Sequence, residues 1–210
     1  MQNRLMKVIN NCGQGTKEWF ELKLGKITGT VLEDILGTPK KREDTLAEII
    51  GERLTPEIDM DYIHESAMAR GTRLEAEARQ AFTYVTGKEI TQVAFVQHEE
   101  YPHIGYSPDG LISETEDIEI KAPQVKNYMK IVLSKEVPKE YHWQIVQGFV
   151  TNPKLETRYF VAYNPDIPSN PIVIIPCHRK DYEEDITKAF DAERKFIEEV
   201  DAKLAELNLK

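Results

Sequence analysis

Residues 107–121 read Ser-Pro-Asp-Gly-Leu-Ile-Ser-Glu-Thr-Glu-Asp-Ile-Glu-Ile-Lys, and they carry the strongest signal in the chain. The stretch begins as a Pro-Asp-Gly turn and ends as a strand in which polar and apolar residues alternate. Because successive side chains of a strand point to opposite faces, Glu119 and Lys121 share one face and the neighbouring isoleucines share the other. The strand therefore presents a carboxylate and an ammonium on one surface, near the carboxylate of Asp109.

This arrangement supplies the groups that hydrolysis of a phosphodiester requires. The reaction needs a cation that bridges the scissile phosphate, oxygen ligands that hold the cation, and a group that positions the attacking water. Asp109 and Glu119 are the predicted ligands of Mg²⁺, with Mn²⁺ as an alternative ion, and the backbone carbonyl of Ile120 would add another oxygen. Lys121 would orient the water or stabilise the developing charge.

The same residues also have a purely structural interpretation. Pro-Asp-Gly is a common turn, and Glu-Ile-Lys is an ordinary half-exposed strand that carries a pair of opposite charges. From residues 108–121 alone, both a nuclease site and a structural turn followed by a strand therefore remain open.

The whole chain has the size and composition of one globular domain. It has 210 residues, of which 40% are hydrophobic and 30% charged, which is enough to bury a core without disulfides or a structural metal. We therefore expect one domain over residues 1–210. No apolar run is long enough to span a bilayer and the N-terminus does not resemble an export signal, so we expect a cytoplasmic protein without membrane association.

Cysteine and histidine usage restricts the kind of metal site. Cys12 and Cys177 are too few for a disulfide framework, a four-thiolate zinc site or an iron-sulfur cluster. The five histidines lack the helical i, i+4 pairing that is typical of zinc sites. A transition metal held by histidine is therefore disfavoured.

The formal net charge of -9 argues against a protein that holds nucleic acid through many phosphate contacts. The objection weakens because a Mg²⁺ site needs clustered carboxylates, and a bound cation makes the local potential positive where a phosphate sits. Basic residues then need only line the path of the substrate.

Hydrophobic spacing along the rest of the chain predicts helices on both sides of a set of strands. The predicted helices cover residues 28–37, about 46–54, 65–85, from Pro138 to Asn152, and about 180–207. The predicted strands cover residues 90–96, 111–112, 118–121, 158–163 and 172–175. Thr30 is the expected N-cap of the first helix, and the basic triplet 40–42 is expected in a mobile loop. This order of elements predicts an α/β or α+β fold with a mixed central sheet flanked by helices.

Pro108-Asp109 followed by Glu119-x-Lys121 resembles the defining motif of the PD-(D/E)xK nuclease superfamily. Longer segments are similar to the phage lambda-type exonuclease, or viral recombinase, family over nearly the whole chain. Residues 19–28 are similar to the family signature W-x3-R-x-G-x-I-T/S, with a lysine in place of the usual arginine. The resemblance implies the restriction-endonuclease-like core of that superfamily.

Two further segments add residues to the implied active site. Residues 70–75 match the family motif G-x3-E, and the resemblance assigns Glu75 as an additional acidic member of the site. Without the resemblance, a glutamate on an amphipathic helix is usually a solvated surface residue. Residues 141–147 resemble the helix whose glutamine contacts the active site, and Gln144 matches that position better than Gln147.

Members of the lambda type digest one strand of duplex DNA from its 5′ end and form a ring of three subunits. The resemblance therefore implies a Mg²⁺-dependent 5′-to-3′ exonuclease that acts on double-stranded DNA ends as a homotrimer. It would leave 3′ single-stranded overhangs for recombination and work with a single-strand annealing protein, as a phage or prophage protein in a bacterial host. Its 5′-phosphate pocket would contain Lys23, Thr30 and Ser107, with Lys126 as a further basic contributor. A lysine there gives a point charge where an arginine gives a planar fork.

Two other functions remain open on the sequence. The first is a different nuclease of the same superfamily, such as a sequence- or structure-specific DNA endonuclease. A member that carries an iron-sulfur cluster is disfavoured by the missing cysteines. The second is a DNA-end-binding protein that no longer cuts, against which the intact set of Asp109, Glu119 and Lys121 argues.

Overall fold

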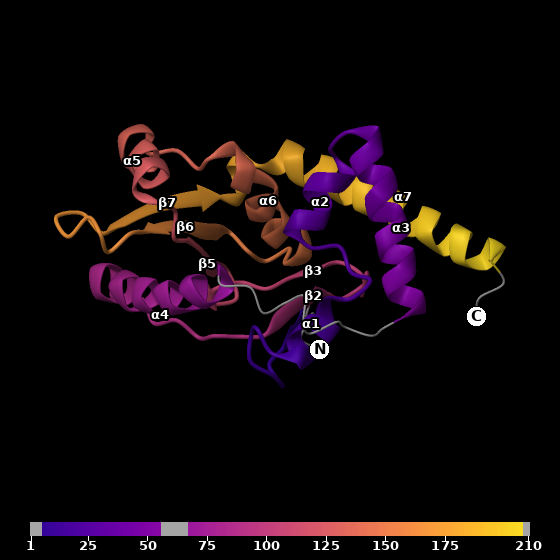
Figure 1. The fold of residues 1–210 in the computed structure, drawn as a ribbon, viewed down its shortest axis with the longest axis horizontal. Helices are drawn as coiled ribbons and strands as arrows, with labels where there is room; N and C mark the ends of the chain where they lie inside the picture. Colours follow the sequence, from indigo (N-terminus) through magenta and orange to yellow (C-terminus); the bar gives the residue numbers. More distant parts are fainter. Residues whose placement is uncertain (1–5, 56–66, 208–210) are drawn as a thin grey trace.

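The computed structural model describes residues 6–55 and 67–207, and only the backbone of residues 67–73 (Figure 1). The helices are α1 (Lys17–Lys23), α2 (Gly29–Ile35), α3 (Pro39–Leu54), α4 (Ala67–Thr86), α5 (Val125–Ser134), α6 (His142–Thr151) and α7 (Glu183–Glu206), with 3₁₀ turns η2 (Lys139–Tyr141) and η3 (Arg179–Asp181). The strands are β1 (Met6–Ile9), β2 (Phe95–His98), β3 (Gly105–Tyr106), β4 (Gly110–Leu111), β5 (Glu116–Lys121), β6 (Thr157–Tyr163) and β7 (Ile172–His178). The expected fold class, mixed α/β with sheets flanked by helices, is confirmed.

The described strands form two sheets. β1, β2 and β3 make a three-stranded sheet, and β4, β5, β6 and β7 make a four-stranded sheet in that order. β5 pairs in parallel with β6, whereas β4 and β7 pair antiparallel to their neighbours, so the larger sheet is mixed as expected. A parallel pair needs a long crossover connection, and α5 and α6 lie within the one that joins β5 to β6.

Helices cover both faces of the larger sheet, with α5 above β6 and β7 in Figure 1 and α4 below them. On the α4 face, Ile118 and Ile120 of β5 belong to one apolar cluster with Phe82. On the other face, Phe160 of β6 belongs to a cluster with Tyr128 of α5. Because β5 is buried on both faces, its polar side chains need partners inside the protein.

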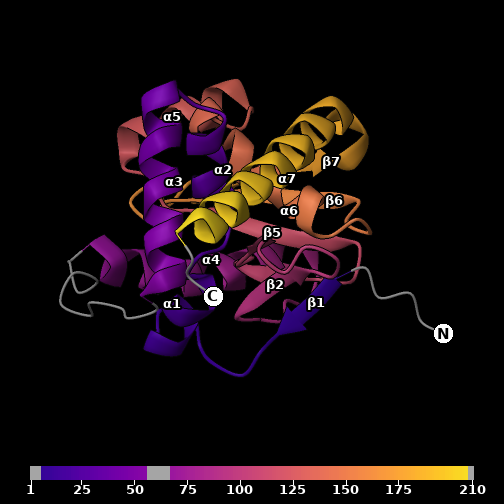
Figure 2. The ribbon, with the colours of Figure 1, turned by 90° about the vertical axis from the view of Figure 1, so that its right-hand side faces the viewer.

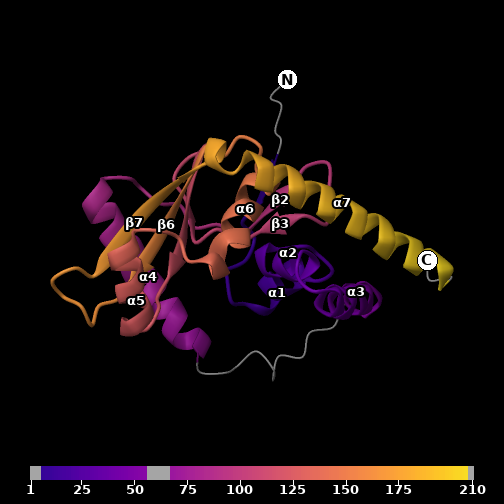
Figure 3. The same ribbon diagram turned by 90° about the horizontal axis from the view of Figure 1, so that it is seen from above.

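A second core joins the first helices to the last one. Residues of α2, α3, α6 and α7 pack into one cluster, and Figure 2 shows α7 crossing beside α3 and α2. In the view of Figure 3, α7 runs from the middle of the molecule to the end opposite α4 and α5. Gly29 at the start of α2 lies so near α6 that a Cβ there would be 2.9 Å from the Cα of Gln144. This close approach places the N-terminal helices beside α6, which positions the site described below.

The basic triplet at residues 40–42 lies in α3, so the expectation of a mobile loop is wrong. The side chain of Thr38 accepts a hydrogen bond from the backbone N–H of Lys41 and caps the helix, and Pro39 occupies its first turn. Threonine and proline at these positions are typical of a helix start, because one satisfies a free N–H and the other has none to satisfy. The triplet is therefore part of a regular helix.

Other boundaries also differ from the expected ones. Thr28, not Thr30, occupies the N-cap position of α2. β2 at Phe95–His98 replaces the strand expected at 90–96, and four of the described elements have no counterpart among the expected ones: α1, α5, β1 and β3. Within the last helix, Glu193 is fully buried. Among the described residues, none of the helices combines the length and apolar character needed to cross a membrane.

Candidate active site

A cavity of about 220 Å³ opens where α1, α2, α4, β5 and α6 meet. The predicted site residues that line it are Lys23, Thr30, Glu75, Ser107, Asp109, Glu119, Lys121 and Gln144. The unpredicted ones are Gln14, Trp19, Thr28, Gly29, Tyr106 and Arg158. We define the carboxylate side of the cavity as Asp109, Glu119 and Lys121, and the hydroxyl side as Lys23, Thr30 and Ser107. A larger groove of about 690 Å³, beside β1, β2 and β4, contains none of the predicted residues, so size alone does not identify the site.

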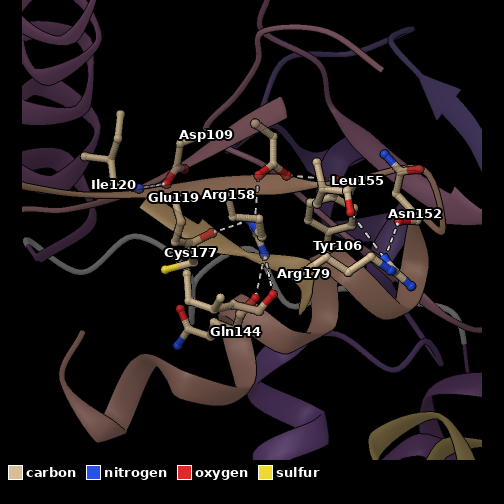
Figure 4. Close-up of polar contacts among 12 residues, drawn as sticks. Tyr106, Asp109, Glu119, Ile120, Gln144, Asn152, Leu155, Arg158, Cys177 and Arg179 are labelled. Atoms are coloured by element: carbon tan, nitrogen blue, oxygen red, sulfur yellow. Dashed lines mark hydrogen bonds and ion pairs between the residues drawn. The ribbon is translucent and has the colours of Figure 1, made fainter. Parts of the chain in front are cut away.

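Asp109 is fixed by the backbone of the neighbouring strand. Its N–H donates to the carbonyl of Ile118 at 3.2 Å, and its Oδ2 accepts a hydrogen bond from the N–H of Ile120 at 2.5 Å (Figure 4). Gly110 follows because a Cβ at that position would overlap the side chain of Ile90. Burial raises the pKa of Asp109 well above its usual value, and the negative charge of Glu119 adds to this effect. A bound cation would relieve this crowding of negative charge.

Glu119 lies between two cations. Its Oε1 is 2.8 Å from the Nζ of Lys121, and its Oε2 accepts a hydrogen bond from Nη2 of Arg158 at 3.0 Å. Burial alone would raise the pKa of Glu119, but the charges of Lys121 and Arg158 outweigh burial and lower it. Burial would likewise lower the pKa of Lys121, yet the carboxylates of Glu119 and Asp109 raise it. Both members of the pair therefore stay charged at neutral pH.

Glu75 reaches the cavity from α4. Its side chain is half-buried, and its Oε2 lies 3.9 Å from Nη1 of Arg79, one helical turn further along. Arg79 also donates from Nη1 to the backbone carbonyl of Asp109 at 3.2 Å. Arg79 thus links Glu75 of α4 to the turn that contains Asp109.

The hydroxyl side is organised by Trp19 of α1. Its indole Nε1–H lies within hydrogen-bond distance of two acceptors, the Oγ of Ser107 at 3.0 Å and the carbonyl of Ala94 at 2.9 Å. The Nζ of Lys23 lies over the same indole ring, 4.2 Å from its centroid. Burial lowers the pKa of Lys23, and the charge of Glu52 opposes this shift. The lysine and the serine therefore face the cavity around one aromatic ring.

Of the remaining predicted residues, Thr30 and Gln144 line the cavity and Lys126 does not. Thr30 is exposed at the cavity, with its Oγ1 3.3 Å from the Oγ1 of Thr28. Gln144 lines the cavity at the start of α6, whereas Gln147 is fully buried one turn later. Lys126 is exposed on α5 and does not line the cavity, so the structure does not bring it together with the other predicted residues.

The sequence of residues 18–152 matches the model of the YqaJ-like viral recombinase domain, which spans more than half of the chain. This chain belongs to the YqaJ-like viral recombinase family. The resemblance to lambda-type exonucleases that the sequence motifs indicated is confirmed.

Solved structures agree with this family assignment. The fold is similar to the crystal structure of an alkaline exonuclease from Laribacter hongkongensis, at 29% identity and a TM-score of 0.82, over 92% of this chain and 96% of that one. A structure of that exonuclease in complex with dAMP is similar at 29% identity and a TM-score of 0.81, over 91% and 96% of the two chains. No curated protein matches the chain.

The carboxylates that line the cavity of this viral recombinase domain would suit a hard divalent cation. Mg²⁺ is commonly bound through one or two carboxylates, and several of its water ligands are retained. Asp109 and Glu119 offer two carboxylates at the cavity, next to the backbone of Ile120, and a positive ion there would offset the repulsion between them. No three side chains of histidine, cysteine, aspartate or glutamate in the described part of the chain converge into a ready-made metal cluster. Direct ligation by Glu75 therefore stays a prediction.

Arg158 is the main residue of this viral recombinase site that the sequence did not predict. It is fully buried, and its Nε donates to Oδ1 of Asp117 at 2.9 Å while the hydroxyl of Tyr106 donates to Oδ2 of the same carboxylate at 2.9 Å (Figure 4). Burial raises the pKa of Asp117 to about 6. The sequence signal was a single arginine on the same face of a predicted strand as the apolar Phe160 and Ala162. Such a residue on a buried face needs an acidic partner.

Proposed function

We propose that this viral recombinase is a Mg²⁺-dependent 5′-to-3′ double-strand DNA exonuclease. It would start at 5′-phosphorylated ends and leave 3′ single-stranded overhangs for recombination. One observation carries the proposal: the carboxylate side and the hydroxyl side line the same cavity. A nuclease that starts at a phosphorylated end needs a site for the terminal phosphate next to a site for the scissile phosphate. The alkaline exonuclease named for the similar structure supports the same activity.

In this proposal Asp109, Glu119 and the carbonyl of Ile120 hold the metal ion, with Glu75 as an additional acidic member. When bound, Mg²⁺, or Mn²⁺ in its place, polarises the scissile phosphate and lowers the pKa of the attacking water. Asp109 contributes as an ionised ligand because a cation offsets the neighbouring carboxylates that otherwise raise its pKa.

Lys121 acts as a fixed positive charge and not as a proton acceptor. Glu119 and Asp109 raise its pKa, so it keeps its proton at neutral pH. Its Nζ is held 2.8 Å from Glu119 and 5.2 Å from the ring centroid of Tyr141. From this position the ammonium orients the attacking water and stabilises negative charge that develops on the phosphate. Gln144, in the first turn of α6, adds a neutral hydrogen-bonding group to the cavity that Lys121 lines.

The hydroxyl side would receive the 5′-phosphate. Ser107 and Thr30 provide hydroxyl donors, and Lys23 provides a charge whose position is set by the ring of Trp19. Lys126 would contribute only to DNA further from this cavity, since it lies on the exposed surface of α5. Because burial lowers the pKa of Lys23, a bound phosphate would draw the lysine toward its charged form.

The wider biological proposal follows from the family. We infer one domain over residues 1–210, a homotrimer around the DNA, a single-strand annealing protein as partner, and a place in the cytoplasm of a bacterium that hosts the phage or prophage. Enclosure of DNA by a ring would replace part of the electrostatic grip that a net charge of -9 does not provide.

The test is digestion of linear duplex DNA labelled at either end, with Mg²⁺ or EDTA. Substrates with a 5′-phosphate, substrates with a 5′-hydroxyl and closed circles are compared. The proposal predicts Mg²⁺-dependent release of nucleotides from 5′-phosphorylated ends while circles stay intact. Cut circles would identify an endonuclease instead, and binding of DNA ends without cleavage would identify an end-binding protein.

A further inference from the structure

The guanidinium of Arg158 joins the carboxylate side of the cavity to the helix that carries Gln144. It donates from Nη2 to Glu119 at 3.0 Å, and from Nη1 to the backbone carbonyl of Gln144 at 2.6 Å (Figure 4). Its third nitrogen, Nε, is occupied by Asp117 at 2.9 Å. One fully buried side chain thus fixes a proposed metal ligand on β5 and the start of α6 at the same time.

The surroundings are shaped to hold this arginine. Its guanidinium carbon lies 4.9 Å from the ring centroid of Tyr106, which supplies a cation–π contact on one side. On the α6 side, residue 148 is glycine, and a Cβ there would overlap the guanidinium. A planar fork with several donors is needed to reach two carboxylates and a carbonyl, and lysine lacks that geometry.

A structural ion pair would be complete with Asp117 alone. The additional bond to Glu119 has a different effect, because it restricts one oxygen of that carboxylate and leaves the other oxygen with Lys121. Two cations therefore set the orientation of Glu119 toward the cavity. Lys121 binds one oxygen of the carboxylate, and the fully buried Arg158 reaches the other oxygen from the core. Groups that orient a metal ligand in this way tune metal affinity without touching the ion.

We propose that Arg158 is a positioning residue that orients Glu119 for the metal ion and places Gln144 beside it. The inference rests on the proposed function, since it assumes that Glu119 is a metal ligand. The guanidinium of Arg158 fits only because residue 148 is glycine, so Gly148 is needed for the same positioning.

The experiment compares Arg158→Lys with a matched control, Arg179→Lys. Arg179 is partly buried, whereas Arg158 is fully buried, and it too binds backbone carbonyls at α6: its Nη1 donates to those of Phe149 and Asn152 at 2.9 and 3.3 Å (Figure 4). It contacts the far end of α6, where its Nη1 also donates to the carbonyl of Leu155 at 3.3 Å, and it lies outside the lining of the cavity. Both variants should lower the melting temperature, so stability alone does not separate them.

Calorimetry measures the binding of Mg²⁺ and, in a separate titration, of Ca²⁺. Mg²⁺-dependent cleavage is measured over the same range of Mg²⁺ concentrations. Arg158→Lys should raise the half-saturating Mg²⁺ concentration about 10- to 100-fold, as for changes to groups that orient metal ligands. Arg179→Lys should leave that concentration unchanged. If Arg158→Lys does not fold, Gly148→Ala takes its place, because the added Cβ displaces the guanidinium without removing its charge. Gly148→Ala should also raise the half-saturating Mg²⁺ concentration.

The outcomes separate this inference from the proposed function. Wild-type Mg²⁺ affinity in a folded Arg158→Lys, or in Gly148→Ala when the lysine variant is unfolded, would overturn the positioning role while the exonuclease proposal stands. A wild-type protein that binds Mg²⁺ but does not cleave would remove the proposed function, and the shift in binding would still decide the role of Arg158. A wild-type protein that binds neither ion would overturn both.

Discussion

The carboxylate side and the hydroxyl side of the cavity are built in different ways. Asp109, Glu119 and Lys121 come from one short stretch of chain and are held by a strand that is buried on both faces. The hydroxyl side is assembled from α1, the start of α2 and the turn before Asp109, which only the fold brings together. The carboxylate side therefore depends on one local stretch of sequence, whereas the hydroxyl side depends on how three separate segments pack.

The largest expected effect is on the carboxylate side. Asp109→Ala and Glu119→Ala should each reduce cleavage by roughly 10³-fold or more, because loss of a metal ligand removes several kcal/mol of transition-state stabilisation. Asp109→Ala should still fold, since the loss of repulsion with Glu119 opposes the loss of the hydrogen bond from the N–H of Ile120. Cleavage rates and thermal unfolding on the same samples check both parts. A variant that loses activity only because it unfolds would not support the assignment.

Lys121→Ala should lower turnover strongly even at saturating Mg²⁺, because the protein still binds the ion, with weaker affinity once one of the two cations that orient Glu119 is lost. We expect a loss of roughly 10²-fold or more in kcat, because a charge aimed at the reacting phosphate is removed from a buried site. Full activity in this variant would remove Lys121 from the mechanism. Calorimetric Mg²⁺ binding is the control that separates a lost charge from a lost metal.

Lys23→Ala tests whether the hydroxyl side acts separately. Digestion of 5′-phosphorylated ends should fall about 10- to 100-fold, the range of one hydrogen bond to a charged group, while digestion of 5′-hydroxyl ends stays the same. Lys23→Arg should keep the preference, because a guanidinium can bind phosphate in two places. An equal loss on both kinds of end would mean that the two sides are not independent.

The pH dependence should distinguish the two lysines by a smaller effect. Carboxylates raise the pKa of Lys121, whereas burial lowers the pKa of Lys23. As the pH rises, Lys23 therefore loses its proton first, and the preference for phosphorylated ends should decline before the rate on hydroxyl ends does. Rates on both substrates across an alkaline pH series measure this order. The reverse order would contradict the assignment of Lys23 to the phosphate.

The same contrast explains what the sequence could predict. Strand alternation placed Glu119 and Lys121 on one face correctly, because that pattern is local and has a period of two. Arg158 was missed because its partner Asp117 lies 41 positions away and meets it only through parallel pairing of β5 and β6. Tertiary pairing of this kind leaves no local pattern.

Two errors in the helices had local causes. The basic residues 40–42 were expected in a loop because residues 38–43 are polar and interrupt the apolar spacing, although Thr38-Pro39 is also a typical helix start. α5 was overlooked although Tyr128 and Ile131 have helical spacing, and both are buried against the sheet. The roles of Lys23 and Thr30 came from family resemblance, since no spacing rule relates them to Asp109.

In the proposed function, the terminal phosphate and the scissile phosphate occupy one cavity. The most direct measurement is the mass of the first product released from a 5′-phosphorylated duplex in the presence of Mg²⁺. The cavity of about 220 Å³ holds both sides together, so we expect single nucleotides that carry a 5′-phosphate. First products several nucleotides long would contradict it, because the two phosphates would then lie too far apart to share the cavity.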